Sequence, residues 1–177
     1  MPVAFLRAIN VGGRQVAKGP LQAVFESLGV SDVSTYLASG NVRFRSRASA
    51  ATLERKIEAA LEAKFGFVVE TFVRSEIALQ AMLKTVPFTP KEMASAHDLW
   101  IAFLKQPPAP DVAKSVAALS TPAERFRLVG RELYWLRVTR EQEPRVVREL
   151  EKLLRPMTAR NVRTVTALAT WHPPPRA

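Results

Sequence analysis

The feature that most constrains the fold is an order of predicted elements that occurs twice along the chain. Over residues 1–74, apolar periodicity and turn residues predict the order strand, helix, strand, strand, helix, strand, which is that of a ferredoxin-like unit. From residue 98 onward the order strand, helix, strand, strand, helix returns, and a helix over residues 158–171 takes the sixth place. A short sequence repeat accompanies this order, because Ala-Phe-Leu-Arg at residues 4–7 and Ala-Phe-Leu-Lys at residues 102–105 match at an offset of 98 residues.

We therefore expect an α+β protein with two ferredoxin-like (βαββαβ-type) halves in one compact unit, the second half ending in an extra C-terminal helix. The expected boundaries are residues 1–74 for the first half, 75–97 for a helical connector, 98–172 for the second half with its terminal helix, and 173–177 for a tail. A chain of 177 residues with 47% hydrophobic content is large enough to bury the core of such a fold.

Start and stop signals support the individual elements. In the first half, strands are predicted over residues 3–9, 33–38, 42–46 and 67–73, and helices over residues 21–28 and 53–65. Pro20 and Gly29 bound the first helix, Ser49 or Thr52 caps the second, and Gly66 ends it. In the second half, strands are predicted over residues 98–105, 124–129 and 132–138, helices over 111–119 and 144–154, and a connector helix over 75–86.

Missing or badly spaced residue types exclude several chemistries. The chain has no Cys, which removes disulfides, thiolate catalysis, iron–sulfur clusters and Cys-type zinc sites. The two His, His97 and His172, do not stand at metal-binding spacing, so we expect no metal site and no cofactor. No catalytic nucleophile stands out. Glu54, Glu58 and Glu62 share one helix face among basic residues, which favours a solvated stripe over paired catalytic carboxylates.

The net charge is strongly positive. Lys and Arg total 26 against 16 Asp and Glu, which gives +10 at pH 7. Such a balance favours polyanions or anionic small molecules as partners. The excess is spread along the chain with no basic tail, and the Arg-rich composition of a GC-rich genome would give the same balance without any polyanionic partner.

Hydropathy gives no sign of a membrane. The chain has no apolar run of the roughly 18 residues that a membrane span needs. Its N-terminus also lacks the basic start and long apolar stretch of a secretory signal. We therefore expect a cytoplasmic protein with no membrane partner.

One pair of loops is predicted to form a site. The link from the first strand to the first helix, residues 10–19, is longer than the Pro-rich link at the same place in the second half, and such loops are more often functional. With strand order 4-1-3-2, the end of the first strand and the turn at residues 39–41 lie at one edge of the sheet. Glycine next to asparagine in both bends frees backbone N–H groups to form an anion-binding concavity. The candidate anion-binding residues are Arg7, Asn10, Gly12, Gly13, Arg14, Lys18, Ser39, Gly40 and Asn41.

A second basic segment opens the predicted final helix. Arg160, Asn161 and Arg163 lie in its first turns, although the helix dipole favours acidic residues there. Either a buried carboxylate offsets this charge, or a bound phosphate or carboxylate does. In the second case these three residues join the candidate anion-binding set.

Three function classes remain open. The best supported is non-catalytic binding of an anionic small molecule or nucleotide phosphate at the Gly-rich loop, unless the glycines and asparagines only shape turns. The second is an RNA- or DNA-binding module, since ferredoxin-like sheets can stack bases on strand aromatics such as Phe5 and Phe44. The RNP1 aromatic pattern is missing, however, and both Phe also suit a core. The third is an enzyme on a phosphorylated or carboxylated substrate, with Arg7 or Arg14 stabilising negative charge.

Three segments together carry a resemblance to a known family. They are Ala-Phe-Leu-Arg-Ala-Ile-Asn-Val-Gly-Gly at residues 4–13, Thr-Tyr-Leu-Ala-Ser-Gly-Asn-Val at 35–42 and Thr-Ala-Arg-Asn-Val-Arg-Thr-Val at 158–165. In this order they resemble the bacterial domain-of-unknown-function family 1697, over essentially the whole chain. The family pattern usually has Gly where Ala8 stands and Trp where Val162 stands. The resemblance implies two ferredoxin-like halves and a small cytoplasmic bacterial protein, and it implies no catalytic residues.

Overall fold

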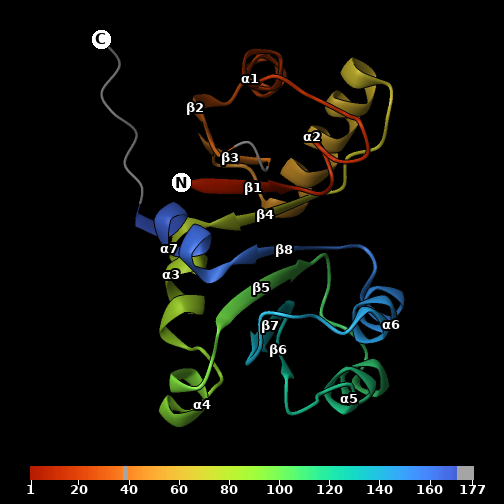
Figure 1. Cartoon of the computed structure of the whole chain (residues 1–177). Helices are drawn as coiled ribbons and strands as arrows, with labels where there is room; N and C mark the ends of the chain where they lie inside the picture. Colours follow the sequence, from red (N-terminus) through yellow and green to blue (C-terminus); the bar gives the residue numbers. More distant parts are fainter. Residues whose placement is uncertain (38–39, 171–177) are drawn as a thin grey trace. The chain divides into compact units, whose positions relative to one another are not determined.

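The computed structural model describes residues 1–37 and 40–170 of the chain (Figure 1). The chain divides into two compact units, one formed by Met1–Ala81 with residues 167–170 and the other by Met82–Thr166. The first part of the chain forms β1 (Pro2–Leu6), α1 (Lys18–Ser27), β2 (Ser31–Tyr36), β3 (Asn41–Arg45), α2 (Ala50–Phe65), β4 (Thr71–Ser75), α3 (Glu76–Lys84) and α4 (Pro90–Ala94). The second part forms β5 (Asp98–Leu104), α5 (Pro110–Ala118), β6 (Glu124–Val129), β7 (Glu132–Arg137), α6 (Pro144–Leu154), β8 (Met157–Asn161) and α7 (Val162–Thr170).

The first unit contains a four-stranded antiparallel sheet in the order β2-β3-β1-β4. This is the ferredoxin-like order that the sequence predicts, with β1 between β3 and β4. Both α1 and α2 lie on one face of the sheet (Figure 1). β1 is shorter than expected, because its ladder ends at Leu6 and the chain then turns into the loop that leads to α1.

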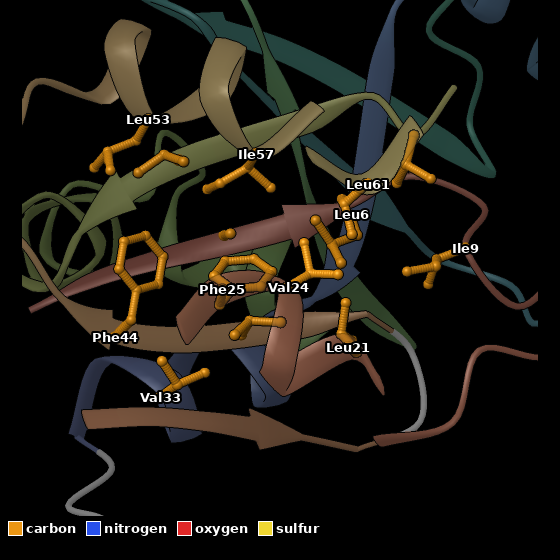
Figure 2. Packing of buried hydrophobic residues seen from close by; sticks show 14 residues of the cluster. Leu6, Ile9, Leu21, Val24, Phe25, Val33, Phe44, Leu53, Ile57 and Leu61 are labelled. Carbon is orange, nitrogen blue, oxygen red and sulfur yellow. The ribbon is translucent and has the colours of Figure 1, made fainter. Parts of the chain in front are cut away.

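The core of the first unit follows from the apolar periodicity of its two helices. Leu21, Val24 and Phe25 of α1 and Leu53, Ile57 and Leu61 of α2 are buried against the strands (Figure 2). The Phe25 and Phe44 rings pack with their centroids 5.4 Å apart. The predicted end signals of α2 are confirmed, since Ser49 accepts a hydrogen bond from the Thr52 N–H and Gly66 has a φ of +76°.

The second unit contains a second four-stranded antiparallel sheet, in the order β6-β7-β5-β8. Its core packs α5 and α6 against one face, with Val146, Leu150 and Leu154 of α6 buried. α6 has the bounds that the sequence predicts. The two sheets with their helices establish the α+β fold of two ferredoxin-like halves, and α7 is the extra C-terminal helix.

One predicted element is wrong, because residues 157–161 form a strand and not the start of the last helix. β8 pairs with β5 from Leu104↔Met157 to Trp100↔Asn161, so the second half has a strand in sixth place. Without β8, the outer N–H and C=O groups of β5 would lack ladder partners, and this long-range pairing outweighs local helix propensity. The helix itself begins at Val162.

Residues 75–97, for which the sequence predicts a helical connector with one helix, contain two helices. The predicted helix over residues 75–86 corresponds to α3, and Ser75 accepts a hydrogen bond from the Ala78 N–H. The short α4 was not predicted, although Thr89 and Glu92 form a capping box at its start. No helix within the described residues is long and apolar enough to cross a membrane.

Candidate functional site

The strand order brings the two glycine–asparagine bends of the first unit together. The backbone N–H of Leu6, the last residue of β1, donates to the carbonyl of Gly40 across 2.8 Å. The chain leaves β1 and passes Ile9, which is buried against the same turn: a Cβ placed on Gly40 would lie 2.8 Å from Ile9 Cγ2. Only glycine permits so close an approach, and Gly40 also has a φ of +74°.

A cleft of about 440 Å³ opens between these bends and the start of α1. Its walls come from the Asn10 loop, the first turn of α1, β2 and the turn that leads into β3. The lining residues are Asn10, Val16, Ala17, Lys18, Leu21, Thr35, Leu37, Gly40 and Asn41. Leu6, Ile9 and Leu61 close the nearby end of the core (Figure 2). The cleft therefore combines an apolar base with amide, hydroxyl and ammonium groups.

The two asparagines of the site stabilise the bends in which they lie. Asn10 Oδ1 accepts a hydrogen bond from the Val16 N–H at 2.7 Å, which closes the loop between β1 and α1. Asn41 is fully buried, and its Nδ2 donates to the Tyr36 carbonyl at 3.1 Å. These contacts support the interpretation that the asparagines shape turns. They also hold both bends in place around the cleft.

The start of α1 gives the cleft a positive end. Ala17 occupies the cap position and offers no side-chain acceptor, and the first turn has no acidic residue. The first helical hydrogen bond runs from the Leu21 N–H to the Ala17 carbonyl at 3.2 Å. Lys18, which is exposed, therefore adds its charge to the positive end of the helix dipole, where a cation is unfavourable unless an anion lies nearby.

The other two basic residues of the predicted site have different surroundings. Arg7 Nη1 lies 2.6 Å from Glu70 Oε2, so its charge is already balanced. The Arg14 guanidinium lies over the Phe67 ring, 4.3 Å from the centroid. Arg14 lines a second cleft of about 510 Å³, formed by residues 13–17 and Asn10.

Backbone conformations that L-residues rarely adopt gather at this end of the sheet. Ala8 has a φ of +51° and Leu37 a φ of +57°, and Gly12 and Gly13 also have positive φ values. Ala8 and Leu37 are exposed. Strained backbone of this kind often accompanies functional loops, although it does not identify their ligand.

Seven described residues of the predicted site do not line the cleft, although two of them, Gly13 and Arg14, line the second one; the seven are Arg7, Gly12, Gly13, Arg14, Arg160, Asn161 and Arg163. Ser39 lies outside the described residues. Arg160 and Asn161 lie on β8 of the second unit, and Arg163 is the second residue of α7, so the prediction that all three open a helix is wrong for the first two. Asn161 Oδ1 instead accepts a hydrogen bond from the Arg163 N–H at 2.9 Å and caps α7.

Arg160 binds its own strand. Its Nη1 donates to Thr158 Oγ1 and to the Ala159 carbonyl, each at 2.8 Å. Burial lowers the pKa of the guanidinium to about 10. This side chain is thus held by local polar groups of the second unit.

Sequence reasoning missed the apolar wall of the cleft and the partners of Arg7 and Arg14. Thr35 lies near the end of β2 and Leu37 directly follows this strand, and the family segment at residues 35–42 already contained both. Phe67 and Glu70 precede β4, and nothing in their local pattern indicates contact with Arg14 or Arg7. Within the described residues, no three His, Asp or Glu side chains gather closely enough to hold a metal ion.

The strand aromatics do not form a base-stacking platform. Phe5 and Phe44 have no exposed surface, and Phe44 packs on Phe25. In the second unit, Trp135 packs against Phe126 with ring centroids 5.6 Å apart. These rings serve as core residues, which was the alternative to RNA stacking.

Comparison with known proteins places the chain in a family. The family model described as "Protein of unknown function (DUF1697)" matches residues 1–134. The chain belongs to the DUF1697 family. The match contains every residue that lines the cleft, and the family description assigns no function. Ala8, where the DUF1697 pattern usually has Gly, is one of the three non-glycine residues with positive φ in the described chain.

A solved structure with the same fold was found by comparison. It is the conserved bacterial protein SP0830 from Streptococcus pneumoniae, which is 23% identical to this chain with a TM-score of 0.74. The similarity covers 95% of this chain and 96% of that one. At this identity the likeness establishes the two-half fold alone. No curated protein matches the chain.

Proposed function

We propose that the cleft between the Asn10 loop, the start of α1 and the Gly40–Asn41 bend binds an anionic small molecule through a phosphate or carboxylate group. The observation that carries this proposal is Lys18, which lines the cleft at the positive end of α1. No carboxylate among residues 1–37 and 40–170 pairs with it. Asn10 and Thr35 supply polar groups on the adjacent walls.

Comparison of the two halves supports this assignment. In the second unit the Leu104 N–H donates to the Arg131 carbonyl at 3.0 Å, as Leu6 donates to Gly40 in the first. The side-chain-bearing Arg131 thus stands where the first half has a glycine. The chain between strand and helix is short there, residues 105–109, against residues 7–17 in the first unit. The two segments that surround the cleft, the loop before α1 and the turn between β2 and β3, are thus both longer in the first half than their counterparts in the second half.

The contacts of Arg7 and Phe44 make the other two function classes less suitable. Arg7 is paired with Glu70 and so does not offer a free charge to a reacting group, and Arg14 does not line the cleft that holds Lys18. Phe5 and Phe44 are buried and do not stack on bases. Binding without catalysis is the function that the cleft supports best.

Thermal unfolding of the full chain with a panel of small anions tests the proposal. A bound anion raises the free energy of unfolding by RT ln(1 + [L]/Kd), about 2.7 kcal/mol at a hundredfold excess over Kd. We expect Lys18→Gln to weaken binding of the stabilising anion about tenfold or more, because a charge-assisted contact is lost. Lys56→Gln, an exposed lysine on α2, is the matched control and should leave binding unchanged.

Two results would contradict the proposal. Either no anion stabilises the protein, or the Lys18 and Lys56 variants bind the anion equally well. Binding of random oligonucleotides that falls steeply with salt, and that the Lys18 variant retains, would instead indicate a nucleic-acid surface.

A further inference from the structure

The basic residues of the first unit fall into two groups. Four arginines are paired with a carboxylate: Arg7 with Glu70 at 2.6 Å, Arg43 with Glu76 at 2.7 Å, Arg45 with Asp32 at 2.7 Å and Arg74 with Glu54 at 3.8 Å. Arg14 and Lys18 have no carboxylate partner in the described part of the chain, and each lines a cleft. Arg14 and Lys18 therefore place two cations, unpaired within residues 1–37 and 40–170, where a ligand can enter.

The two clefts lie on either side of one short wall. Asn10, Val16 and Ala17 line both of them. The 2.7 Å hydrogen bond between the Val16 N–H and Asn10 Oδ1 fixes this wall. A ligand in the Lys18 cleft that extends past Val16 reaches the cleft lined by Arg14.

Arg14 is arranged to bind an oxyanion. One face of its guanidinium lies over the Phe67 ring at 4.3 Å, which orients the plane of the group. Stacking occupies the face and leaves the N–H donors at the edge, whose fork matches a carboxylate or a phosphate. Lys18 presents a point charge that accepts oxyanions of either geometry.

We infer that the ligand carries two oxyanion groups, one bound at Lys18 and the other at Arg14 across the Asn10–Val16 wall. This inference rests on the proposed function and specifies its ligand class as a compound with two phosphate or carboxylate groups. Gly13 and Gln15 line the Arg14 side, so the second group has backbone and amide donors around it.

Isothermal titration calorimetry of the full chain with matched anions tests this inference. The phosphate arm compares inorganic phosphate with pyrophosphate and tripolyphosphate, and the carboxylate arm compares acetate with succinate and glutarate. In one arm we expect the two-group anion to bind about tenfold tighter than its single-group counterpart. The arm in which this happens identifies the oxyanion.

Arg14→Gln should remove this gain, so that the two-group anion binds about as tightly as its single-group counterpart. Arg47→Gln, an exposed arginine that lines neither cleft, controls for the loss of one positive charge and should keep the gain. Arg14→Lys retains the positive charge but not the two parallel N–H donors of the guanidinium. This variant should therefore keep only part of the gain in affinity. Phe67→Leu removes the stacking partner and should likewise reduce the gain.

The outcomes separate this inference from the proposed function. If single-group anions bind in a Lys18-dependent way but two-group anions bind no tighter, or if Arg14→Gln and Arg47→Gln behave alike, the inference is wrong and the proposed function stands. If neither single-group nor two-group anions bind, both the inference and the proposed function are wrong.

Discussion

Ala8 has a backbone conformation that alanine rarely adopts. Its φ of +51° lies in the left-handed region, and its side chain is exposed, so no packing compensates for the strain. A non-glycine residue there costs roughly 1–2 kcal/mol, whereas glycine adds about 0.4–1 kcal/mol of unfolded-state entropy. The glycine of the family pattern at this position thus has a physical reason.

We therefore expect Ala8→Gly to raise the free energy of unfolding by roughly 0.5–1 kcal/mol, measured by urea denaturation. Ala59→Gly, at an exposed position inside α2, is the control and should lower it by about 1 kcal/mol. A loss of similar size in both variants would mean that position 8 is not strained in solution.

At the scale of elements, α2 protects the edge of its own sheet. The Thr71 and Val73 N–H groups of the edge strand β4 donate to Glu58 Oε1 at 2.8 Å and Glu54 Oε1 at 2.7 Å. Four helical residues and two strand residues both rise about 6–7 Å, which allows the two rows to match. The prediction of a solvated stripe is wrong for these two glutamates, because helical spacing alone does not show that a strand edge lies alongside.

The hairpin between β2 and β3 depends on Gly40 for its position against β1. A Cβ on this residue would lie 2.8 Å from Ile9 Cγ2 and 3.1 Å from Leu6 Cβ, both in the core. We expect Gly40→Ala to destabilise the protein by about 2–3 kcal/mol, from the sum of overpacking and positive φ.

Gly12→Ala isolates the backbone contribution to this loss. Gly12 has a similar φ of +66°, but a Cβ there meets nothing within 4 Å. Gly12→Ala should therefore lower the free energy of unfolding by only about 1 kcal/mol. Equal losses in chemical denaturation of the two variants would show that the close approach between the hairpin and the end of β1 contributes nothing.

At the scale of the whole molecule, elements that local signals determine could be predicted from the sequence, whereas elements that depend on long-range contacts could not. The bounds of α2 and α6 follow from apolar spacing, Ser49, Gly66 and Pro144, which all act within one helix. β8 could not be read from Met157–Asn161, because its strand state comes from pairing with β5, far away in the sequence. The predicted strand order was enough to show that the two bends of the cleft meet. The pairing of Arg7 with Glu70 could not be predicted, because only the three-dimensional fold brings these two side chains together.

The stability of the molecule should depend on pH through a buried carboxyl group, Glu124 at the start of β6. Burial raises the pKa of Glu124 above its ordinary value of 4.5, and Glu143 adds to this by charge repulsion. The Glu143 backbone, Trp135 and the opposite residue Arg137 act in the other direction but do not cancel the effect. The folded state therefore holds the Glu124 proton more tightly than the unfolded state does.

A raised pKa favours folding below the unfolded-state pKa, and this contribution is lost as pH rises through the folded-state pKa. Glu124→Gln keeps the shape of the protonated side chain and cannot ionise. We expect it to be increasingly more stable than the wild type as pH rises from 4, with the difference levelling off once the wild-type carboxyl is ionised in the folded state. Urea denaturation of both proteins from pH 4 to 8 measures this difference, and other carboxylates affect both proteins alike. Glu141→Gln, at an exposed position, is the control and should show no such trend. A constant difference in stability between wild type and Glu124→Gln from pH 4 to 8 would contradict the raised pKa of Glu124.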